Sequence, residues 1–240
     1  MGQGNSLPER LSNASKTATF TLTDSGLKTV PDKVLEIVKL RNLDLSKNRI
    51  NEIPAEISRL CNLRFLSLSQ NKLSSLPLSL FQLACLETLN LSRNRIVELP
   101  QAGFEQLKSL KTLDLSNNRI QQLPDSIGFL SKLITLQISD NNITRLTDSI
   151  VSLNSLEDLD VSRNRIEEIP DTFTNMPAIK SLRLADNRLG RFPETFLEAT
   201  GIVWIELDGN PFDEIRLRQL SGYDKYILRR KDRVDQFIRA

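Results

Sequence analysis

An asparagine recurs every 23 residues along most of this 240-residue chain, with a single step of 24 residues. The recurring positions are Asn48, Asn71, Asn94, Asn118, Asn141, Asn164, Asn187 and Asn210. Leucine-like residues keep fixed offsets from each asparagine, as Leu43, Leu45 and Ile50 do from Asn48. A unit this short cannot bury its own apolar face, so it must stack on copies of itself. The period therefore predicts a solenoid with one long open surface.

The unit around Asn94 indicates what each part of the repeat does. Residues 89–91 alternate apolar and polar side chains, which is typical of a strand with one buried face. The amide of Asn94 both donates and accepts, so we expect it to bond the backbone of neighbouring turns. Pro100 lacks a backbone donor and has a fixed φ angle, which disfavours a second central strand on the return path. The eight asparagines are therefore predicted to form a structural ladder.

The return half of the unit recurs as regularly as the strand half. It reads Ile53-Pro54, Leu76-Pro77, Leu99-Pro100, Leu123-Pro124, Ile169-Pro170 and Phe192-Pro193, and once Leu146-Thr147. The combined pattern resembles the cytoplasmic leucine-rich repeats of the Ras-suppressor and Shoc-2 type. The resemblance implies an α/β fold, with parallel strands on the concave face, short turns or 3-10 segments on the convex face, and a C-terminal capping helix.

The repeat predicts one continuous domain with two different ends. Counting back 23 residues from Asn48 reaches Ser25, which lies among apolar residues and is expected to mark a degenerate first unit. We expect a flexible acylated leader over residues 1–15, a solenoid over residues 16–212 and a helical cap over residues 213–240. Apolar residues in the cap fall three or four positions apart, so one helix face could lie on the last repeat.

The first six residues, Met1-Gly2-Gln3-Gly4-Asn5-Ser6, fit the pattern M-G-x-x-x-[ST]. The pattern predicts an amide-linked myristate on Gly2; the alternative is a short leader that begins Met-Gly by chance. One myristoyl chain gives a partition constant of about 10⁴ M⁻¹, which is marginal and reversible. A second membrane signal looks weak, because the leader offers only Arg10 and Lys16. The basic run at Arg229–Arg233 falls at the opposite end of the solenoid, about 40 Å away. We therefore expect a membrane association that can be switched.

The cysteine content and the absence of catalytic motifs indicate the cellular compartment and disfavour an enzyme. The chain has two cysteines, Cys61 and Cys85, with neither disulfide-rich caps nor a secretory apolar segment, which indicates a reducing compartment. Together with the Gly2 pattern, this predicts a cytoplasmic protein held peripherally on membranes by its lipid. It has no histidine, the commonest general base and metal ligand, and no glycine-rich phosphate loop. We expect no enzyme activity, no cofactor, no metal site and no small-molecule substrate.

The concave face is the candidate site, because strand alternation points the side chains six, four and two positions before each asparagine away from the core. Acids gather toward its second half, and two large aromatics stand in a small polar background, as interface hot spots do. The residues predicted to bind a protein partner are Phe65, Asn90, Asp114, Gln137, Asp158, Asp160, Arg183, Trp204 and Glu206. For Trp204 a second interpretation stays open, namely packing under the capping helix near Tyr223 or Tyr226.

A basic residue follows most of the ladder asparagines and predicts a cationic stripe along one edge of the solenoid. These residues are Arg49, Lys72, Arg95, Arg119, Arg165 and Arg188. Such a row could track phosphates. However, the slot is solvent-facing, long basic stems cover apolar turns, and the net charge is only +2, so we expect no nucleic-acid partner.

Over its full length the chain is similar to the family of leucine-rich-repeat-containing protein fifty-seven. The two ends carry that similarity, through the Met1–Ser6 start and the closing residues 209–212 and 222–226. The resemblance implies a lipid-anchored, intracellular repeat protein with no assigned enzymatic activity. The sequence thus predicts a non-enzymatic protein-interaction scaffold that visits membranes through Gly2. By analogy with the Shoc-2 class, a regulatory subunit that positions a phosphatase or a small GTPase stays open as an alternative.

Overall fold

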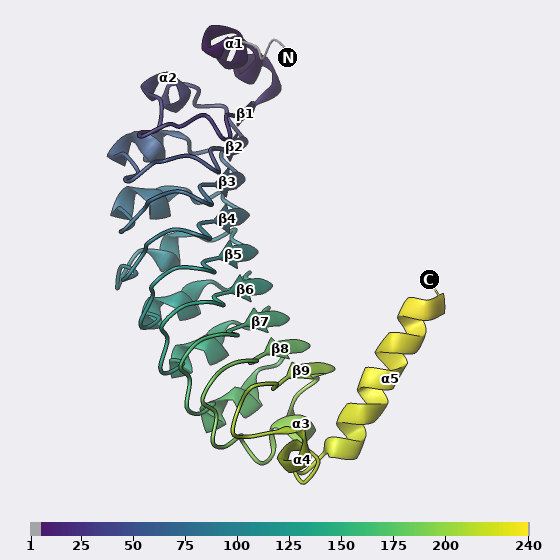
Figure 1. Ribbon diagram of the computed structural model, residues 1–240. Helices are drawn as coiled ribbons and strands as arrows, with labels where there is room; N and C mark the ends of the chain where they lie inside the picture. The colour runs from purple at the N-terminus through teal and green to yellow at the C-terminus, as the bar shows by residue number, and fades with distance from the viewer. Residues whose placement is uncertain (1–5, 240) are drawn as a thin grey trace.

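Nine short parallel strands form one open sheet in which each strand pairs with the next along the chain (Figure 1). The computed structural model describes the backbone of residues 6–239 and the side chains of residues 6–233. The strands are β1 (Thr19–Thr21), β2 (Asn42–Asp44), β3 (Phe65–Ser67), β4 (Thr88–Asn90), β5 (Thr112–Asp114), β6 (Thr135–Gln137), β7 (Asp158–Asp160), β8 (Ser181–Arg183) and β9 (Trp204–Glu206). The predicted solenoid is confirmed, and β1 is the strand of the unit that precedes the first ladder asparagine.

Short helices line the opposite, convex side of the solenoid (Figure 1). They are α2 (Asp32–Leu35), η1 (Ala55–Arg59), η2 (Leu78–Gln82), η3 (Phe104–Gln106), η4 (Asp125–Phe129), η5 (Asp148–Ser152), η6 (Asp171–Asn175) and α3 (Phe196–Ala199), the η segments being 3-10 helices. A proline stands directly before most of the 3-10 helices, where its fixed φ directs the chain into the turn. The residue at the centre of each strand points inward, so one core runs from Phe20 to Leu217 and Tyr226.

The chain turns after each strand through a residue in the left-handed region. Lys47, Gln70, Arg93, Asn117, Asp140, Arg163 and Asp186, each directly before a ladder asparagine, have φ between 52° and 58°, and Gly209 has φ 75°. Side chains other than glycine are disfavoured there, although asparagine and aspartate tolerate the region best. Because only the last of these positions is a glycine, the sequence pattern did not reveal this turn.

The single 24-residue step is absorbed at Gly103. This glycine has φ +112°, and a Cβ there would approach the Phe81 ring to 2.9 Å. Phe81 in turn packs edge-on against Phe104, with ring centroids 4.8 Å apart. The extra residue therefore bulges on the convex side and leaves the strand register intact.

The first end of the solenoid differs from the prediction. Residues 7–15 were expected to belong to a flexible leader, but α1 (Leu7–Thr17) is a helix that packs on β1. Ser6 and Glu9 form a capping box, a signal that was present in the sequence but outside the repeat pattern. Ala14 is fully buried, and Arg10 donates to the carbonyl of Thr21 at 3.2 Å. The helix thus covers the first edge of the sheet.

The other end is closed by α4 (Glu214–Leu217) and the first turns of α5 (Tyr223–Arg239). Tyr226 is buried, and Arg229 donates to the carbonyls of Leu197 and Ile202 at 2.6 and 3.0 Å. Further along, Leu228 is 62% exposed, and α5 leaves the body at an angle to the sheet (Figure 1). Two helices therefore form the cap, and among the described side chains the contacts lie near the start of α5.

Candidate protein-binding surface

The asparagine ladder sets the spacing of every side chain on the concave face. Asn94 is typical: its Oδ1 accepts from the backbone N–H of Leu73 at 3.0 Å, and its Nδ2 donates to the carbonyls of Leu68 and Leu91, both at 2.9 Å. Leu68 and Leu73 belong to the preceding unit, so each amide ties its own turn to the one before it. All eight asparagines make equivalent bonds, and Ser25 stands at the one ladder position with no preceding turn to bind.

The predicted partner-binding residues lie in two adjacent rows of the concave sheet. Strand pairing is in register throughout, so Phe65, Asp158 and Trp204 fall in the row that begins at Thr19. The second row, which begins at Thr21, holds Asn90, Asp114, Gln137, Asp160, Arg183 and Glu206. Residues far apart in the sequence are thereby brought side by side at the spacing of a parallel sheet, about 4.8 Å per strand.

Several polar residues of the second row also have a structural role. Asp160 accepts from the backbone N–H of Ser162 at 3.0 Å and from its hydroxyl at 2.5 Å. Asn90 makes the same pair of contacts with Ser92, and Asp114 accepts from the N–H of Ser116. Each side chain bonds the backbone two residues ahead, which stabilises the turn into the ladder. The recurrence of Asp or Asn two positions before Ser was the sequence signal for this role.

Arg183 lies within the acidic end of the face rather than beside it. Its guanidinium is 3.1 Å from Asp158 and 4.0 Å from both Asp160 and Glu206. All four side chains are partly exposed, so water and salt weaken the attraction. The cluster leaves more acid than base on β7 to β9, which favours a partner with basic groups there.

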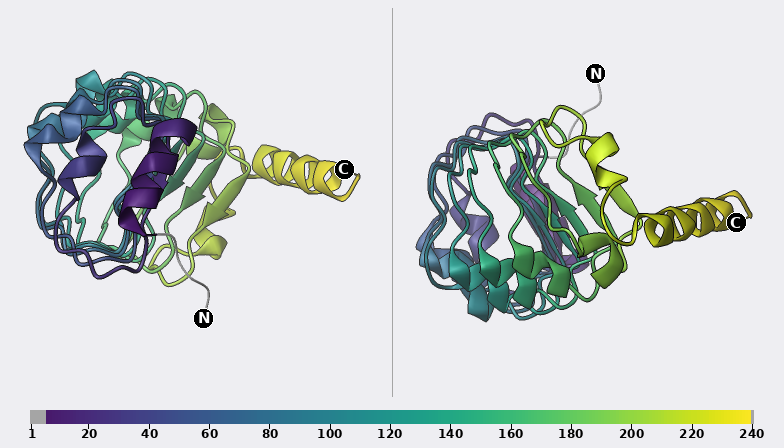
Figure 2. Two further views of the ribbon diagram at one scale, coloured as in Figure 1. Left: turned by 90° about the horizontal axis from the view of Figure 1, so that it is seen from above. Right: turned by 90° about the horizontal axis from the view of Figure 1, so that it is seen from below.

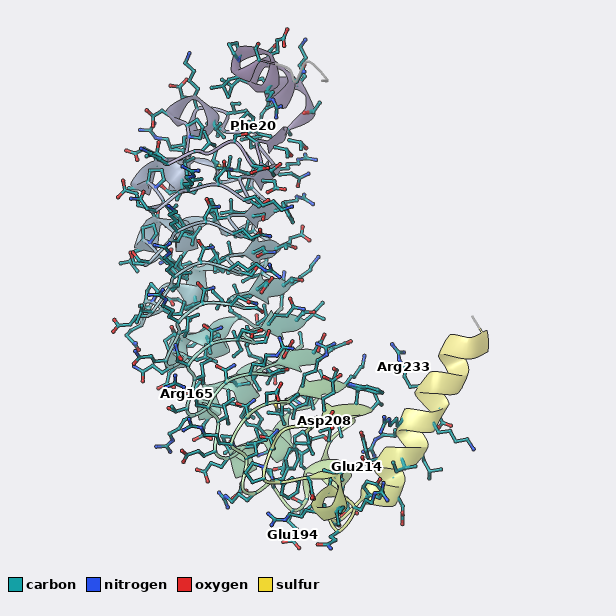
Figure 3. The ribbon with its side chains drawn as sticks, viewed as in Figure 1. Phe20, Arg165, Glu194, Asp208, Glu214 and Arg233 are labelled. Atoms are coloured by element: carbon teal, nitrogen blue, oxygen red, sulfur yellow. The ribbon has the colours of Figure 1, made fainter. Side chains whose placement is uncertain are left out.

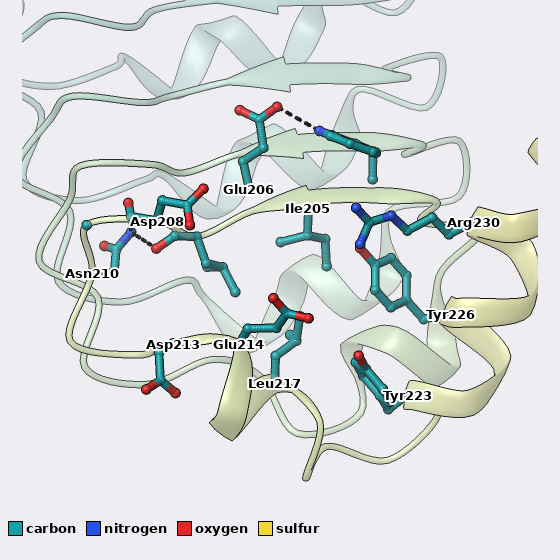
Figure 4. Close-up of a pocket in the computed structure, with 13 residues that line it drawn as sticks. Ile205, Glu206, Asp208, Asn210, Asp213, Glu214, Leu217, Tyr223, Tyr226 and Arg230 are labelled. Carbon is teal, nitrogen blue, oxygen red and sulfur yellow. Dashed lines mark hydrogen bonds between the residues drawn. The ribbon is translucent and has the colours of Figure 1, made fainter. Parts of the chain in front are cut away.

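Trp204 contacts the cap through a residue that the sequence interpretation did not name. Arg230 of α5 stands over the indole ring, 4.6 Å from its centroid, and the indole Nε1 donates to Glu206 at 2.7 Å. Tyr223 and Tyr226 line the same pocket of about 280 Å³ without being the residues that cover the ring. Figure 4 shows Tyr226 and Arg230 on the α5 side of this pocket and Glu206 and Asp208 on the β9 side. Trp204 remains 37% exposed, so it serves the cap and still presents a surface.

Phe65 has a different setting from Trp204. It is partly exposed on β3, between Asn42 of β2 and Thr88 of β4 in the same row. The neighbouring side chains are small and polar, and the cap lies at the far end of the sheet (Figure 1). Phe65 is therefore a large apolar side chain that the amino-terminal half of the concave face partly presents to solvent.

The cationic stripe lies at the carboxyl ends of the strands. In each unit the backbone N–H of the residue after the ladder asparagine donates to the preceding turn, as Arg49 does to Leu27 and Arg95 does to Leu73. The side chains of the six basic residues in this slot are exposed, and Figure 3 shows Arg165 among them. Asn142 replaces a basic residue at one position of the slot.

The predicted lipid site, Gly2, lies outside the described residues. Within the described part of the chain, no helix has the length and apolar character that crossing a membrane requires. No three metal-binding side chains converge among the described residues either. Cys61 and Cys85 are exposed free thiols.

The geometry agrees with the family to which the sequence is similar. The family described as "Leucine-rich repeat region" matches residues 24–118 and 85–183. No curated protein matches the chain in sequence. A leucine-rich-repeat protein of Leptospira interrogans is similar in structure, with a TM-score of 0.68 and 32% identity over 84% of this chain and 58% of its own.

Two receptor structures are also similar. One is the leucine-rich-repeat ectodomain of the plant membrane receptor kinase GASSHO1/SCHENGEN3 from Arabidopsis thaliana, in complex with Casparian strip integrity factor 2, with a TM-score of 0.64 and 31% identity. The other is a TLR13–ssRNA13 complex, with a TM-score of 0.70 and 25% identity. The matches cover 75% and 80% of this chain, but only 23% and 33% of the two receptors, so this chain spans a minor part of either protein.

Proposed function

The chain belongs to the leucine-rich-repeat family, and we propose that it is a non-enzymatic scaffold that binds protein partners on its concave sheet and reaches membranes reversibly through myristate on Gly2. The open concave sheet is the observation that supports the proposed protein binding. The described helices line the convex side and the two ends of the solenoid, apart from α5, which projects on the concave side beside the last strands (Figures 1 and 2). Most side chains of the two concave rows are at least partly exposed. Solenoids of this kind use such extended concave surfaces for binding.

The composition of the face favours a protein partner. Phe65 offers an apolar anchor in a polar field, and the side chains around Arg183 offer charged groups that select among partners. The similar plant ectodomain was solved in complex with Casparian strip integrity factor 2, which supports a binding role for the repeat region. The resemblance of the two chain ends to the family of leucine-rich-repeat-containing protein fifty-seven is the ground for proposing an intracellular, cytoplasmic scaffold.

Affinity capture from cell extract followed by mass spectrometry tests the surface. Phe65→Ala should remove the partner signal by tenfold or more, as expected for a hot spot above about 1.4 kcal/mol. Asp160→Asn removes a charge yet keeps an oxygen that accepts from Ser162, so it tests electrostatics without opening the turn. Phe129→Ala is the matched control, because Phe129 is 67% exposed on the convex helix η4. Partners that survive both concave changes, or that are lost with Phe129→Ala instead, would place the binding surface elsewhere.

The lipid part has its own test. Protein co-expressed with an N-myristoyltransferase should show one myristoyl group on Gly2 by intact mass, and Gly2→Ala should show none. The acylated protein should pellet with vesicles while Gly2→Ala stays in the supernatant at high salt, where charge attraction is screened. An unmodified amino terminus in cells would remove the anchor from the proposed function.

A further inference from the structure

We propose that one edge of the solenoid is a docking face for an anionic lipid surface and acts together with the acyl chain on Gly2. The face consists of the basic residues in the first four ladder turns, and we call it the cationic edge. Its members are Lys47, Arg49, Lys72, Arg93, Arg95 and Arg119. The proposal rests on the proposed lipidation for its second signal, but its charge component can be tested without the lipid.

The six side chains form a continuous exposed row. Arg49, Lys72, Arg95 and Arg119 occupy the same slot of successive units, where each backbone N–H donates to the preceding turn at 2.7 to 2.8 Å. At about 4.8 Å per unit, the row from Arg49 to Arg119 is roughly 15 Å long. All six are exposed, and none forms an ion pair with another described residue.

The later turns of the same edge share this character only in part, because Arg165 and Arg188 are exposed but other cations of these turns are paired with acids. Arg163 lies 3.4 Å from Asp140 and 3.7 Å from Asp186, and Arg191 lies 3.0 Å from Glu168. In residues 140–192 the turns carry acids nearly as often as bases, whereas the first four turns oppose their six cations with only two carboxylates, Glu52 and Glu98. The positive potential is therefore concentrated near the amino-terminal end.

The fold brings the start of helix α1 to this edge. Helix α1 is followed after one residue by β1 and packs on it, so the two elements run in opposite directions. The contact from Arg10 to the carbonyl of Thr21, at the end of β1, agrees with this direction. The start of α1 consequently lies at the carboxyl ends of the strands, where the ladder turns are. Figure 2 shows it on the same side of the solenoid as α4, the helix that follows the last ladder asparagine.

This arrangement supplies the second membrane signal that the sequence analysis could not find in the leader. Gly2 is four residues before Ser6 in the sequence, and a chain of four residues reaches at most about 14 Å. Each basic residue near an anionic membrane surface strengthens partitioning by about fivefold, whereas a single myristoyl chain alone is marginal. Several side chains of a short row can approach a membrane surface together, and docking by the edge leaves the concave sheet open to a protein partner.

Vesicle sedimentation with matched charge reversals tests the proposal. The test pair is Lys72→Glu with Arg95→Glu, and the control pair is Arg165→Glu with Arg188→Glu, which changes the same slot in the later units. Acylated wild-type protein should bind phosphatidylcholine vesicles containing phosphatidylserine at least tenfold more tightly than pure phosphatidylcholine. The test pair should remove that preference, and the control pair should reduce it less than threefold. Far-UV circular dichroism verifies that all variants are folded.

The unacylated protein separates the two parts of the idea. Gly2→Ala should retain weak, salt-sensitive binding to anionic vesicles that the test pair abolishes, and this result would support the cationic edge even if native Gly2 proves unmodified. Equal losses from the test and control pairs, or no preference of the acylated protein for anionic vesicles, would overturn the proposal. It would also be overturned if the test pair abolished retention on single-stranded RNA while leaving vesicle binding unchanged, because the edge would then serve a nucleic acid.

Discussion

The ladder asparagines should contribute unequally to stability, and Asn141 is a suitable place to measure the difference. Its Nδ2 donates to the carbonyls of Leu115 and Ile138 at 3.0 and 3.1 Å, and its Oδ1 accepts from the N–H of Ile120 at 2.9 Å. The residue is 8% exposed, so water has little access to the groups that it bonds. Replacement by alanine therefore tests the inter-turn bonds directly.

The cost can be worked out from what the alanine leaves behind. The carbonyls of Leu115 and Ile138 keep bonds from the amides of the neighbouring ladder positions, at 2.9 and 3.0 Å. The N–H of Ile120 loses its acceptor in a buried place. An orphaned buried donor costs about 1–3 kcal/mol and the other lost bonds add roughly 1 kcal/mol, so Asn141→Ala should destabilise the protein by about 2–4 kcal/mol.

Asn210 provides the control, because it makes the same bonds at the end of the ladder, where it is partly exposed. Water can replace its amide, so Asn210→Ala should cost only about 1 kcal/mol. Urea unfolding followed by circular dichroism gives both free energies of unfolding. A break in the middle of a one-dimensional array should also lower the m-value for Asn141→Ala more than for Asn210→Ala.

Asn141→Asp tests the donor separately, because it keeps an oxygen that can accept from the N–H of Ile120 and removes the Nδ2 group that donates to the carbonyls of Leu115 and Ile138. A carboxylate facing carbonyl oxygens is disfavoured when charged, so the pKa of the introduced group should be raised in the folded protein. Its protonated form should stabilise the variant at low pH, and that stability should be lost as the pH rises through the folded pKa. The reasoning is refuted if Asn141→Ala and Asn210→Ala cost the same, or if Asn141→Asp shows no such dependence on pH.

Two further predictions concern the return path and the cap. Thr147 stands where other units have proline and has φ −77°, within the range of −56° to −77° found for Pro54, Pro77, Pro124 and Pro170. Thr147→Pro should therefore raise the free energy of unfolding, measured by urea titration, by up to about 1 kcal/mol, because proline lowers the entropy of the unfolded chain. A decrease would indicate that the Thr147 hydroxyl, which bonds Ser149 and Asp125, matters more than the backbone. Burial raises the pKa of the Tyr226 hydroxyl above its ordinary value of 10.0. The contribution of neutral Tyr226 to the free energy of unfolding should therefore be fully present below pH 10 and should be lost as the pH rises through the pKa of the folded protein. Near-ultraviolet spectra of wild type and Tyr226→Phe should differ in alkaline unfolding, and identical profiles would rule out this residue as the cause.

On the concave face, the sequence pattern predicted the direction of the side chains but not their bonding partners. Alternation within each strand placed Phe65, Asp158 and Arg183 on the open face, because a strand of fixed period has only two sides. It did not reveal that Asp160 bonds its own turn, since the same carboxylate is equally compatible with free exposure. Nor did it identify Arg230 as the partner of Trp204, because those residues belong to segments with no common period.

The periodic part of this protein could be derived from its sequence, since each turn contacts only the turns before and after it and a local pattern therefore specifies the contact. The strand order, the inward asparagines and the rows of the open face all follow from that nearest-neighbour rule. The ends and the charge balance required the tertiary structure. Helix α1 was missed because its capping signal lies outside the repeat, and its direction on β1 decides that the start of the helix lies at the edge where the ladder turns are. Likewise, only the folded distances distinguish Arg163, which is paired with acids of adjacent turns, from Arg95, which is not. Side-chain pairing depends on geometry between turns that residue spacing along the chain does not carry.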